Sequence, residues 1–355
     1  MPRSSQRSEA DSLHSLHNHS ISPSLPKDTL LLRTLASPIN PADINQIQGV
    51  YPSKPPLTPL LGTPEPSAIA GNEGCFEVVT VGPGVSTLKK GDWVTMSHTN
   101  FGTWRTHAVA NLADVSKINN KEGLTPTQVG TVSVNPCTAY RMLKDFEAMK
   151  EGEWFIQNGA NSGVGRAAIQ FGRLWGLKSI NVIRERPTAA ETQKLKDDLL
   201  AIGATHVVTE AELMDRAFKD SVKSWCGDRQ IRLGLNCVGG KATSSLIKCL
   251  GHNGHLVTYG GMAKAPLALP TAALIFKNIT FHGFWVSRWS DQNKTEKQRM
   301  VDEILELTRK GEFKDVPMQK IEWSWETKGE GLIEAVQGTL EGFRGGKGVF
   351  VYGET

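Results

Sequence analysis

The sequence predicts an α/β protein with two domains: a β-rich, barrel-like domain and a doubly wound parallel sheet covered by helices. Before residue 135, short apolar runs are separated by glycine and proline turns, which is typical of a compact β domain. From Asn135 onward, strand-like runs alternate with helical segments, which favours a parallel sheet with helices on both faces. The C-terminal residues end in a helix candidate and a strand, and they are expected to rejoin the first domain. We therefore expect one domain made of residues 1–134 and 315–355 and another made of residues 135–314.

In the first domain, a strand is expected at Thr29–Leu35, followed by a proline and asparagine turn at Ser37–Asp43. The segment Tyr51–Pro66 holds six prolines in sixteen residues, which forbids regular structure and predicts a surface loop. Further strands are expected at Cys75–Val81 and within Lys90–Thr95.

In the second domain, a helix candidate begins at Cys137 and the first strand begins at Trp154. The remaining strands are expected at Ser179–Ile183, His206–Thr209, Ile231–Val238, His255–Tyr259 and Ile279–Trp285.

A glycine turn marks a nucleotide site in this second domain. The apolar run at Trp154 breaks into Gly159, Gly163 and Gly165, and helical periodicity follows, which is the order strand, phosphate turn, helix. The spacing departs from G-x-G-x-x-G, so the prediction depends on the flanking elements. The next strand ends in Arg184-Glu185-Arg186, where arginine suits the 2'-phosphate of NADP(H). An ordinary packing turn and a solvated strand end are the alternatives.

Composition limits the remaining classes of function. No apolar run approaches 18 residues, so no transmembrane span is predicted. The net charge of +4 is small and dispersed, so nucleic acid is a weak candidate partner. The five cysteines show no C-x-x-C pair, so neither a zinc lobe nor a disulfide framework is predicted, and a reducing compartment is implied.

Tyr51 is the candidate proton donor, because it stands at the head of the proline-rich loop. A phenol with a pKa of about 10 stays protonated at neutral pH; a half-packed loop tyrosine is the alternative. The segments Tyr259–Met262 and Phe284–Ser287 follow predicted strands, where doubly wound sheets bind ligands. Their alternative is ordinary turn and core packing. No histidine has a trustworthy metal-ligand spacing.

Several motifs in order give the sequence a family resemblance. It resembles the mitochondrial 2-enoyl thioester reductases, in the zinc-free branch of the medium-chain dehydrogenase/reductase superfamily. Zinc alcohol dehydrogenases of similar layout would place a histidine where Asn72 stands, so no metal is expected. The motifs that carry the resemblance lie at residues 40–52, 71–74, 102–105, 135–141, 235–241, 259–262 and 284–285.

The resemblance implies a GroES-like catalytic domain and a Rossmann domain. It implies NADPH-dependent reduction of trans-2-enoyl thioesters of acyl carrier protein or coenzyme A, the last step of mitochondrial type II fatty acid synthesis, with the acyl chain in the cleft between the domains. The family's tyrosine donor falls on Tyr51. Its cofactor contacts fall on Asn135, Asn161, Ser162, Gly163, Val164, Arg184, Glu185, Arg186, Tyr259, Gly260, Gly261, Met262, Phe284, Trp285, Val286, Ser287 and Lys347. A helix cap and a surface charge are the alternatives for Asn135 and Lys347.

The N-terminal segment does not identify the compartment. Arg3 and Arg7 resemble a presequence, whereas Glu9 and Asp11 argue against one. Only sixteen residues precede the segment that resembles the family from His17 onward, which is room for a presequence or a first strand but not comfortably both. A mitochondrial matrix location follows from the resemblance alone, with the cytoplasm as the alternative.

Two other functions stay open from the sequence. One is a quinone or small enone reductase of the same zinc-free branch, and the other is a non-catalytic NADPH-binding protein. The family also suggests a homodimer.

Overall fold

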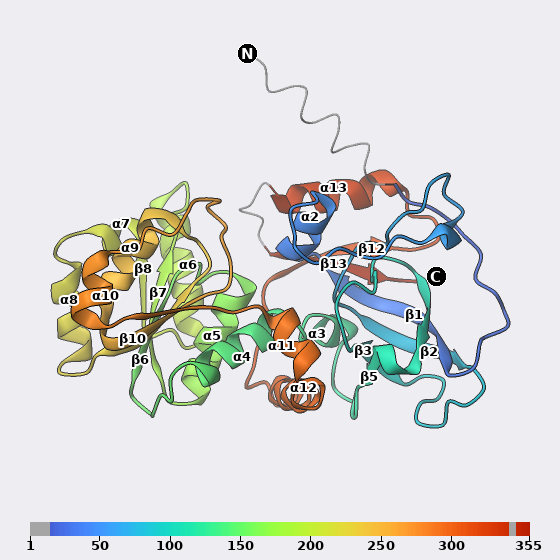
Figure 1. Ribbon diagram of the computed structural model, residues 1–355, viewed down its shortest axis with the longest axis horizontal. Coiled ribbons are helices and arrows are strands. Elements are labelled where there is room, and N and C mark those ends of the chain that lie inside the picture. The colour runs from blue at the N-terminus through green and yellow to red at the C-terminus, as the bar shows by residue number, and fades with distance from the viewer. Residues whose placement is uncertain (1–14, 341–345) are drawn as a thin grey trace, which may run out of the picture. The chain divides into compact units, whose positions relative to one another are not determined.

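The computed structural model describes residues 15–340 and 346–355, and the chain divides into two compact units (Figure 1). Unit 1 takes the chain up to Val134 together with Ser287–Arg309 and Asp315–Thr355, and unit 2 takes Asn135–Val286 and Lys310–Lys314. The N-terminal residues 1–14, which bear on the presequence, lie outside the described residues.

Residues 287–309 group with unit 1, whereas the sequence assigned them to the second domain. The reason is a buried face on their helix: the Lys297 ammonium group donates to the carbonyl oxygens of Met96 and Ser97, each at 3.1 Å. Near the end of the helix, Arg309 donates to the Glu122 carbonyl oxygen at 2.9 Å.

Unit 1 is built on a mixed sheet whose centre is the first strand. The strand order is β12-β13-β1-β2-β3-β5, and β4 also pairs with β1. Residues 36–38 of β1 pair with β13, so the C-terminal strand rejoins this unit. Leu30, Leu32, Phe76 and Val78 are fully buried in the core. The strands are β1 (Thr29–Pro38), β2 (Cys75–Val81), β3 (Trp93–Met96), β4 (His107–Asn111), β5 (Val115–Lys117), β12 (Met318–Trp323) and β13 (Lys347–Tyr352).

Helices and short 3-10 turns complete unit 1. The predicted turn at Ser37–Asp43 is wrong, because β1 continues to Pro38 and a helix begins at Pro41. The loop predicted at Tyr51–Pro66 is irregular except for one 3-10 turn and an isolated bridge between Thr58 and Ser67. The helical elements are α2 (Pro41–Ile47), η1 (Pro59–Leu61), η2 (Leu112–Asp114), α3 (Pro126–Gly130), α11 (Val286–Gln292), α12 (Lys294–Arg309) and α13 (Gly329–Leu340).

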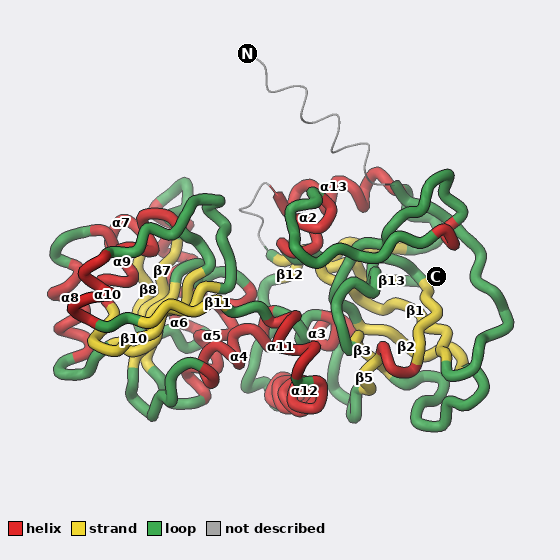
Figure 2. Tube along the Cα trace, in the orientation of Figure 1, coloured by secondary structure: helices red, strands yellow, loops and turns green. Residues whose placement is uncertain are grey.

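Unit 2 is a doubly wound sheet of six parallel strands in the order β11-β10-β9-β6-β7-β8. Figure 2 shows its strands in yellow, flanked by red helices. The strand β6 comes first in this unit, and the winding reverses between β6 and β9, which creates the switch point where such sheets bind ligands. The strands are β6 (Trp154–Gln157), β7 (Lys178–Ile183), β8 (His206–Thr209), β9 (Ile231–Asn236), β10 (Leu250–Thr258) and β11 (Thr280–Gly283).

The helices of unit 2 connect these parallel strands. They are α4 (Asn135–Asp145), α5 (Gly163–Leu174), α6 (Ala189–Ala201), α7 (Glu210–Met214), α8 (Phe218–Cys226), α9 (Gly240–Cys249) and α10 (Thr271–Lys277). The longest of them has 13 residues, and among the described residues no helix is long and apolar enough to cross a membrane.

Candidate cofactor and active site

The glycine turn of unit 2 joins β6 to α5, and close packing requires its small residues. A Cβ atom on Gly165 would lie 2.6 Å from the Ala160 backbone, so no side chain fits where α5 packs against the turn. Gly159 has a φ of +60°, in the left-handed region that favours glycine. The Ser162 hydroxyl caps α5 by accepting from the Gly165 N–H at 3.1 Å. The first N–H groups of a helix have no partner within the helix, and a helix start of this kind can bind a phosphate.

The ends of β9 and β10 lie against the same turn. A Cβ on Gly159 would lie 2.4 Å from the Cys237 sulfur, just after β9. The Met262 N–H donates to the Cys237 carbonyl oxygen at 2.9 Å, which folds the segment after β10 over the end of β9. The buried Tyr259 hydroxyl faces Cys237 and Ser162, and burial raises the pKa of this phenol well above its usual value. The structure therefore brings the Tyr259–Met262 segment to the glycine turn.

Asn135, the first residue of α4, also lies at this turn. A Cβ on Gly163 would lie 2.6 Å from its side-chain nitrogen. Farther along the strand ends, the Phe284 N–H donates to the Thr258 carbonyl oxygen at 2.9 Å, which holds the segment after β11 beside β10.

Arg184, Glu185 and Arg186 follow β7 directly, as the sequence predicts. Arg184 and Glu185 are exposed, and Arg186 is half-buried. The pKa of Arg186 is lowered by burial and by the neighbouring charge of Arg184, and Glu191 partly offsets this. A dianionic phosphate would relieve the repulsion between the two guanidinium groups.

These features fit a dinucleotide with a 2'-phosphate. The turn leaves room only for backbone where a pyrophosphate would approach, and the cations stand at the strand end where a ribose phosphate would lie. Of the residues that the sequence predicts as cofactor contacts, those that lie in unit 2 are Asn135, Asn161, Ser162, Gly163, Val164, Arg184, Glu185, Arg186, Tyr259, Gly260, Gly261, Met262, Phe284, Trp285 and Val286.

In unit 1, the candidate proton donor follows helix α2. Tyr51 is half-buried, and its N–H donates to the Asn45 carbonyl oxygen at 3.2 Å. The start of α2 is fixed by a capping box, in which the Asn40 N–H donates to the Asp43 carboxylate at 2.7 Å, and by Pro41 in the first turn. The position of Tyr51 therefore depends on this helix.

Asn72 anchors α2 through both ends of its amide. Its nitrogen donates to Asp43 Oδ1 and to Gln46 Oε1, each at 2.6 Å, and its oxygen accepts from the Asn100 N–H at 2.8 Å. Only 8% of Asn72 is exposed. Asn72, which stands where zinc alcohol dehydrogenases would have a histidine, thus joins three hydrogen bonds that require both the donor and the acceptor of its amide.

Glu73 continues this buried network toward β13. Its carboxylate accepts from the Asn40 amide at 3.0 Å and from the Val134 N–H at 2.9 Å. Lys347 donates to the Asn40 amide oxygen. Burial raises the pKa values of Glu73 and Asp43 and lowers that of Lys347, while the opposite charges partly offset each shift. Lys347 and Ser287, predicted as cofactor contacts, thus belong to unit 1 together with Tyr51.

Some residues of the site were not predicted. The network of Asn40, Asp43 and Glu73 gives no local signal beyond the capping pattern. Arg166 in α5 does give one, because a cation interrupts an otherwise small and apolar helix start. Within residues 15–340 and 346–355, no three histidine, cysteine, aspartate or glutamate side chains cluster so as to hold a metal.

The fold and the sequence of each domain identify the class of enzyme fold to which the protein belongs. Residues 26–131 match the alcohol dehydrogenase GroES-like domain, and residues 163–311 match the family described as zinc-binding dehydrogenase, which is a Rossmann-type domain. The protein has the architecture of the medium-chain dehydrogenases/reductases, as the sequence predicts.

Within this class, the chain belongs to the mitochondrial enoyl-[acyl-carrier-protein] reductases. It is 51% identical over 292 residues to that reductase from Yarrowia lipolytica, covering 82% of this chain and 75% of the relative. It is 41% identical over 312 residues to the human one, covering 86% of this chain and 79% of the relative.

Comparison with solved structures gives the same family. The Etr1p/Etr2p heterodimer of mitochondrial 2-enoyl thioester reductase from Candida tropicalis matches with a TM-score of 0.89 and 42% identity, over 95% of this chain and 94% of that one. A complex of Etr1p with NADP and crotonyl-CoA matches with a TM-score of 0.88 and 41% identity, over 94% of both chains. A quinone oxidoreductase from Pseudomonas syringae, at 20% identity and a TM-score of 0.73, shares the fold.

Proposed function

We propose that this protein reduces trans-2-enoyl thioesters with NADPH, as the last step of acyl-chain elongation on acyl carrier protein or coenzyme A. The observation that carries the proposal is that the chain belongs to the enoyl reductase family. The tightly packed glycine turn and the Arg184 and Arg186 pair after β7 support the use of NADPH. A solved structure of the related Etr1p is a complex with NADP and crotonyl-CoA, which supports both the proposed cofactor and the proposed thioester substrate.

When bound, NADPH supplies a hydride to Cβ of the enoyl thioester. The electron pair of the C=C bond then moves toward the thioester carbonyl, and Cα needs a proton. We assign that proton to the Tyr51 hydroxyl: its O–H bond breaks as the Cα–H bond forms, and the phenolate regains a proton from water. Asn72 and Asp43 hold α2, and through it the donor, in place.

The substrate test offers trans-2-hexenoyl-CoA and a benzoquinone side by side and follows NADPH oxidation. We expect turnover of the thioester. Turnover of the quinone alone would overturn the proposal in favour of a quinone reductase, and NADPH binding without turnover of either would favour a non-catalytic binding protein.

The role of Tyr51 is tested by Tyr51→Phe, with Tyr140→Phe as a control. Removing the donor should lower kcat by about 10²- to 10⁴-fold while the Kd of NADPH stays nearly unchanged. The hydroxyl of Tyr140 accepts from Lys144 at 3.0 Å, on a helix of unit 2, and its loss should leave kcat unchanged. Normal turnover by Tyr51→Phe would remove Tyr51 from the mechanism.

We place the protein in the mitochondrial matrix, because the relatives from Yarrowia lipolytica and human are mitochondrial proteins. A C-terminal fluorescent fusion and protease protection of isolated mitochondria test this location. A fusion that stays in the cytoplasm would contradict it.

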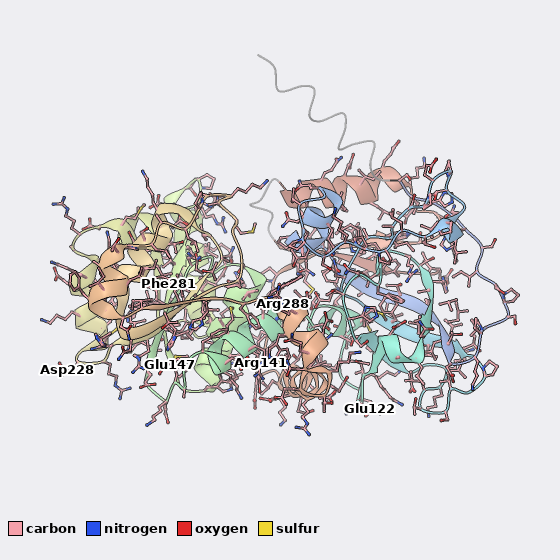
Figure 3. All side chains as sticks on the ribbon, viewed as in Figure 1. Glu122, Arg141, Glu147, Asp228, Phe281 and Arg288 are labelled. Atoms are coloured by element: carbon pink, nitrogen blue, oxygen red, sulfur yellow. The ribbon has the colours of Figure 1, made fainter. Side chains whose placement is uncertain are left out.

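We also propose a homodimer formed through the free edge of the unit 2 sheet. Among the strands of the described residues, β11 pairs with β10 alone, and Figure 3 labels Phe281 on this edge strand. Beside it, α10 exposes Leu274 (47%), Ile275 (66%) and Phe276 (75%) to solvent. Apolar exposure of this size next to an unpaired edge is typical of an interface.

Sedimentation velocity tests the dimer. Phe276→Asp should yield monomers at micromolar concentration. Leu200→Asp, at a residue on α6 that is 45% exposed, is the control and should leave the assembly unchanged. A dimer that survives Phe276→Asp would place the interface elsewhere.

A further inference from the structure

Arg166 is a buried cation in the first turns of α5. Only 8% of the residue is exposed. Its Nε and Nη2 atoms both donate to the Asn161 amide oxygen, at 3.0 and 2.8 Å. Among the described residues it forms no ion pair within 4.0 Å with a carboxylate, since Asp198 acts on it only at longer range. A buried charge held by one neutral oxygen is costly unless another group compensates it.

Charges of both signs act on Arg166, and none of them forms an ion pair with it among the described residues: Asp198 attracts it from beyond 4.0 Å and Arg186 repels it. Arg186 repels Arg166, and Arg184 repels Arg186, so three guanidinium groups interact where the start of α5 approaches the end of β7. Burial has the largest effect on the pKa of Arg166 and lowers it; Asp198 raises this pKa, and Arg186 lowers it by less than Asp198 raises it. At Arg166 the attraction of Asp198 outweighs the repulsion from Arg186, but burial still lowers the pKa; at Arg186 the repulsion from Arg184 outweighs the attraction of Glu191.

Asn161 links this cation to the glycine turn. It stands one residue before the Ser162 cap of α5, and its side-chain oxygen is fixed by the fork of Arg166. A single guanidinium group therefore orients a residue of the pyrophosphate turn and adds positive charge beside the Arg184 and Arg186 pair.

We propose that Arg166 is a positioning and specificity-determining residue for the cofactor: it holds Asn161 in the turn and raises the preference for NADPH over NADH through its charge. This inference rests on the proposed use of NADPH. A dianionic 2'-phosphate at the end of β7 lowers the repulsion among the three arginines, whereas NADH, which lacks that group, leaves the repulsion in place.

The experiment measures binding rather than turnover. Isothermal titration gives the Kd values of NADP⁺, NAD⁺, 2',5'-ADP and 5'-ADP for the wild type, Arg166→Gln and Arg166→Lys. The glutamine removes the charge and keeps an amide donor for Asn161, and the lysine keeps the charge and removes the fork. Arg173→Gln is the control: Arg173 is exposed on the same helix and donates to the Glu312 carbonyl oxygen.

For Arg166→Gln we expect the Kd of NADP⁺ and of 2',5'-ADP to rise about tenfold, which corresponds to about 1.4 kcal/mol. The Kd of NAD⁺ and of 5'-ADP should change less than about twofold, and the salt dependence of NADP⁺ binding should weaken. Arg166→Lys should retain most of the preference, and Arg173→Gln should retain all of it.

Equal losses for NADP⁺ and NAD⁺, or no loss for either, would overturn the assignment and leave Arg166 a structural residue of α5. Should Arg166→Gln fail to fold, loss of the NADP⁺ preference in a folded Arg166→Lys would overturn it too, because the charge is kept there. Wild-type protein that binds NADP⁺ selectively through Arg166 but reduces no enoyl thioester would overturn the proposed function and leave this inference standing.

Discussion

Replacing Asn72 by alanine tests whether this amide, rather than a metal ligand, organises the catalytic unit. The change removes three hydrogen bonds, to Asp43, to Gln46 and from the Asn100 N–H. Because Asn72 is 8% exposed and Asp43 is fully buried, water cannot easily replace the lost partners.

The magnitude follows from the kind of each bond. A neutral hydrogen bond contributes about 1 kcal/mol net, and a bond to a charged group about 1.5–3 kcal/mol. Two neutral bonds and one bond to the Asp43 carboxyl therefore sum to about 3–5 kcal/mol. Since a domain is stable by about 5–15 kcal/mol, a large share of the stability of unit 1 is at stake.

The assay is urea unfolding, followed by hydrogen exchange of unit 1 amides so that the two units are measured separately. Asn72→Ala should lower the midpoint for unit 1 amides and leave unit 2 amides unaffected. The control is Asn119→Ala, which removes one exposed bond to Asp302 and should cost less than about 1 kcal/mol. If the unit 1 amides of Asn72→Ala kept the wild-type protection from hydrogen exchange, Asn72 would not be the residue that organises unit 1.

Three further outcomes are expected. Gly165→Ala should weaken NADPH binding at least about tenfold and lower Tm, because its Cβ would lie 2.6 Å from the Ala160 backbone. The control is Gly331→Ala on α13 of unit 1, whose Cβ meets nothing within 4 Å and which should leave both the thermal shift and the binding unchanged. Arg184→Ala should weaken NADP⁺ binding far more than NAD⁺ binding by titration, and equal losses would contradict a 2'-phosphate contact. Burial raises the pKa of Asp43 from 3.8 to about 6, so the folded state holds this proton more tightly than the unfolded chain. The contribution of Asp43 to the free energy of unfolding is complete below about pH 4 and falls by about 3 kcal/mol as pH rises through 6. The difference in urea midpoint between the wild type and Asp43→Asn should therefore decrease over this pH range. A difference that stays constant with pH would contradict the prediction.

Local patterns predicted the regular elements well and the junctions less well. The strands at Cys75–Val81 and His206–Thr209 have the predicted bounds, because the first ends at the turn of residues 82–84 and the second ends at Thr209, which caps α7. The sequence does not predict the helix α2, because the prolines and asparagines at its start are also typical of a turn. Asn40 followed by Pro41, with Asp43 three residues after the cap, is instead a helix start.

The parts of the site that depend on distant residues could not be predicted from spacing. Lys347 and Asn40 are 307 residues apart and meet only because β13 pairs with β1. The glycine turn, in contrast, is local, and the sequence alone indicated both the turn and the arginines after the next strand. Long-range pairing therefore marks the limit of prediction from a single sequence.

The strand β13 also sets the order in which the protein can fold during synthesis. Nearly all of unit 2 is one continuous stretch, Asn135–Val286, so its parallel sheet can form before the C-terminal residues leave the ribosome. In unit 1, β1 is synthesised early, but its partner strand β13, residues 347–352, is synthesised last. Until then its apolar strands lack part of their sheet, and this interval is when we expect the nascent chain to depend most on chaperones.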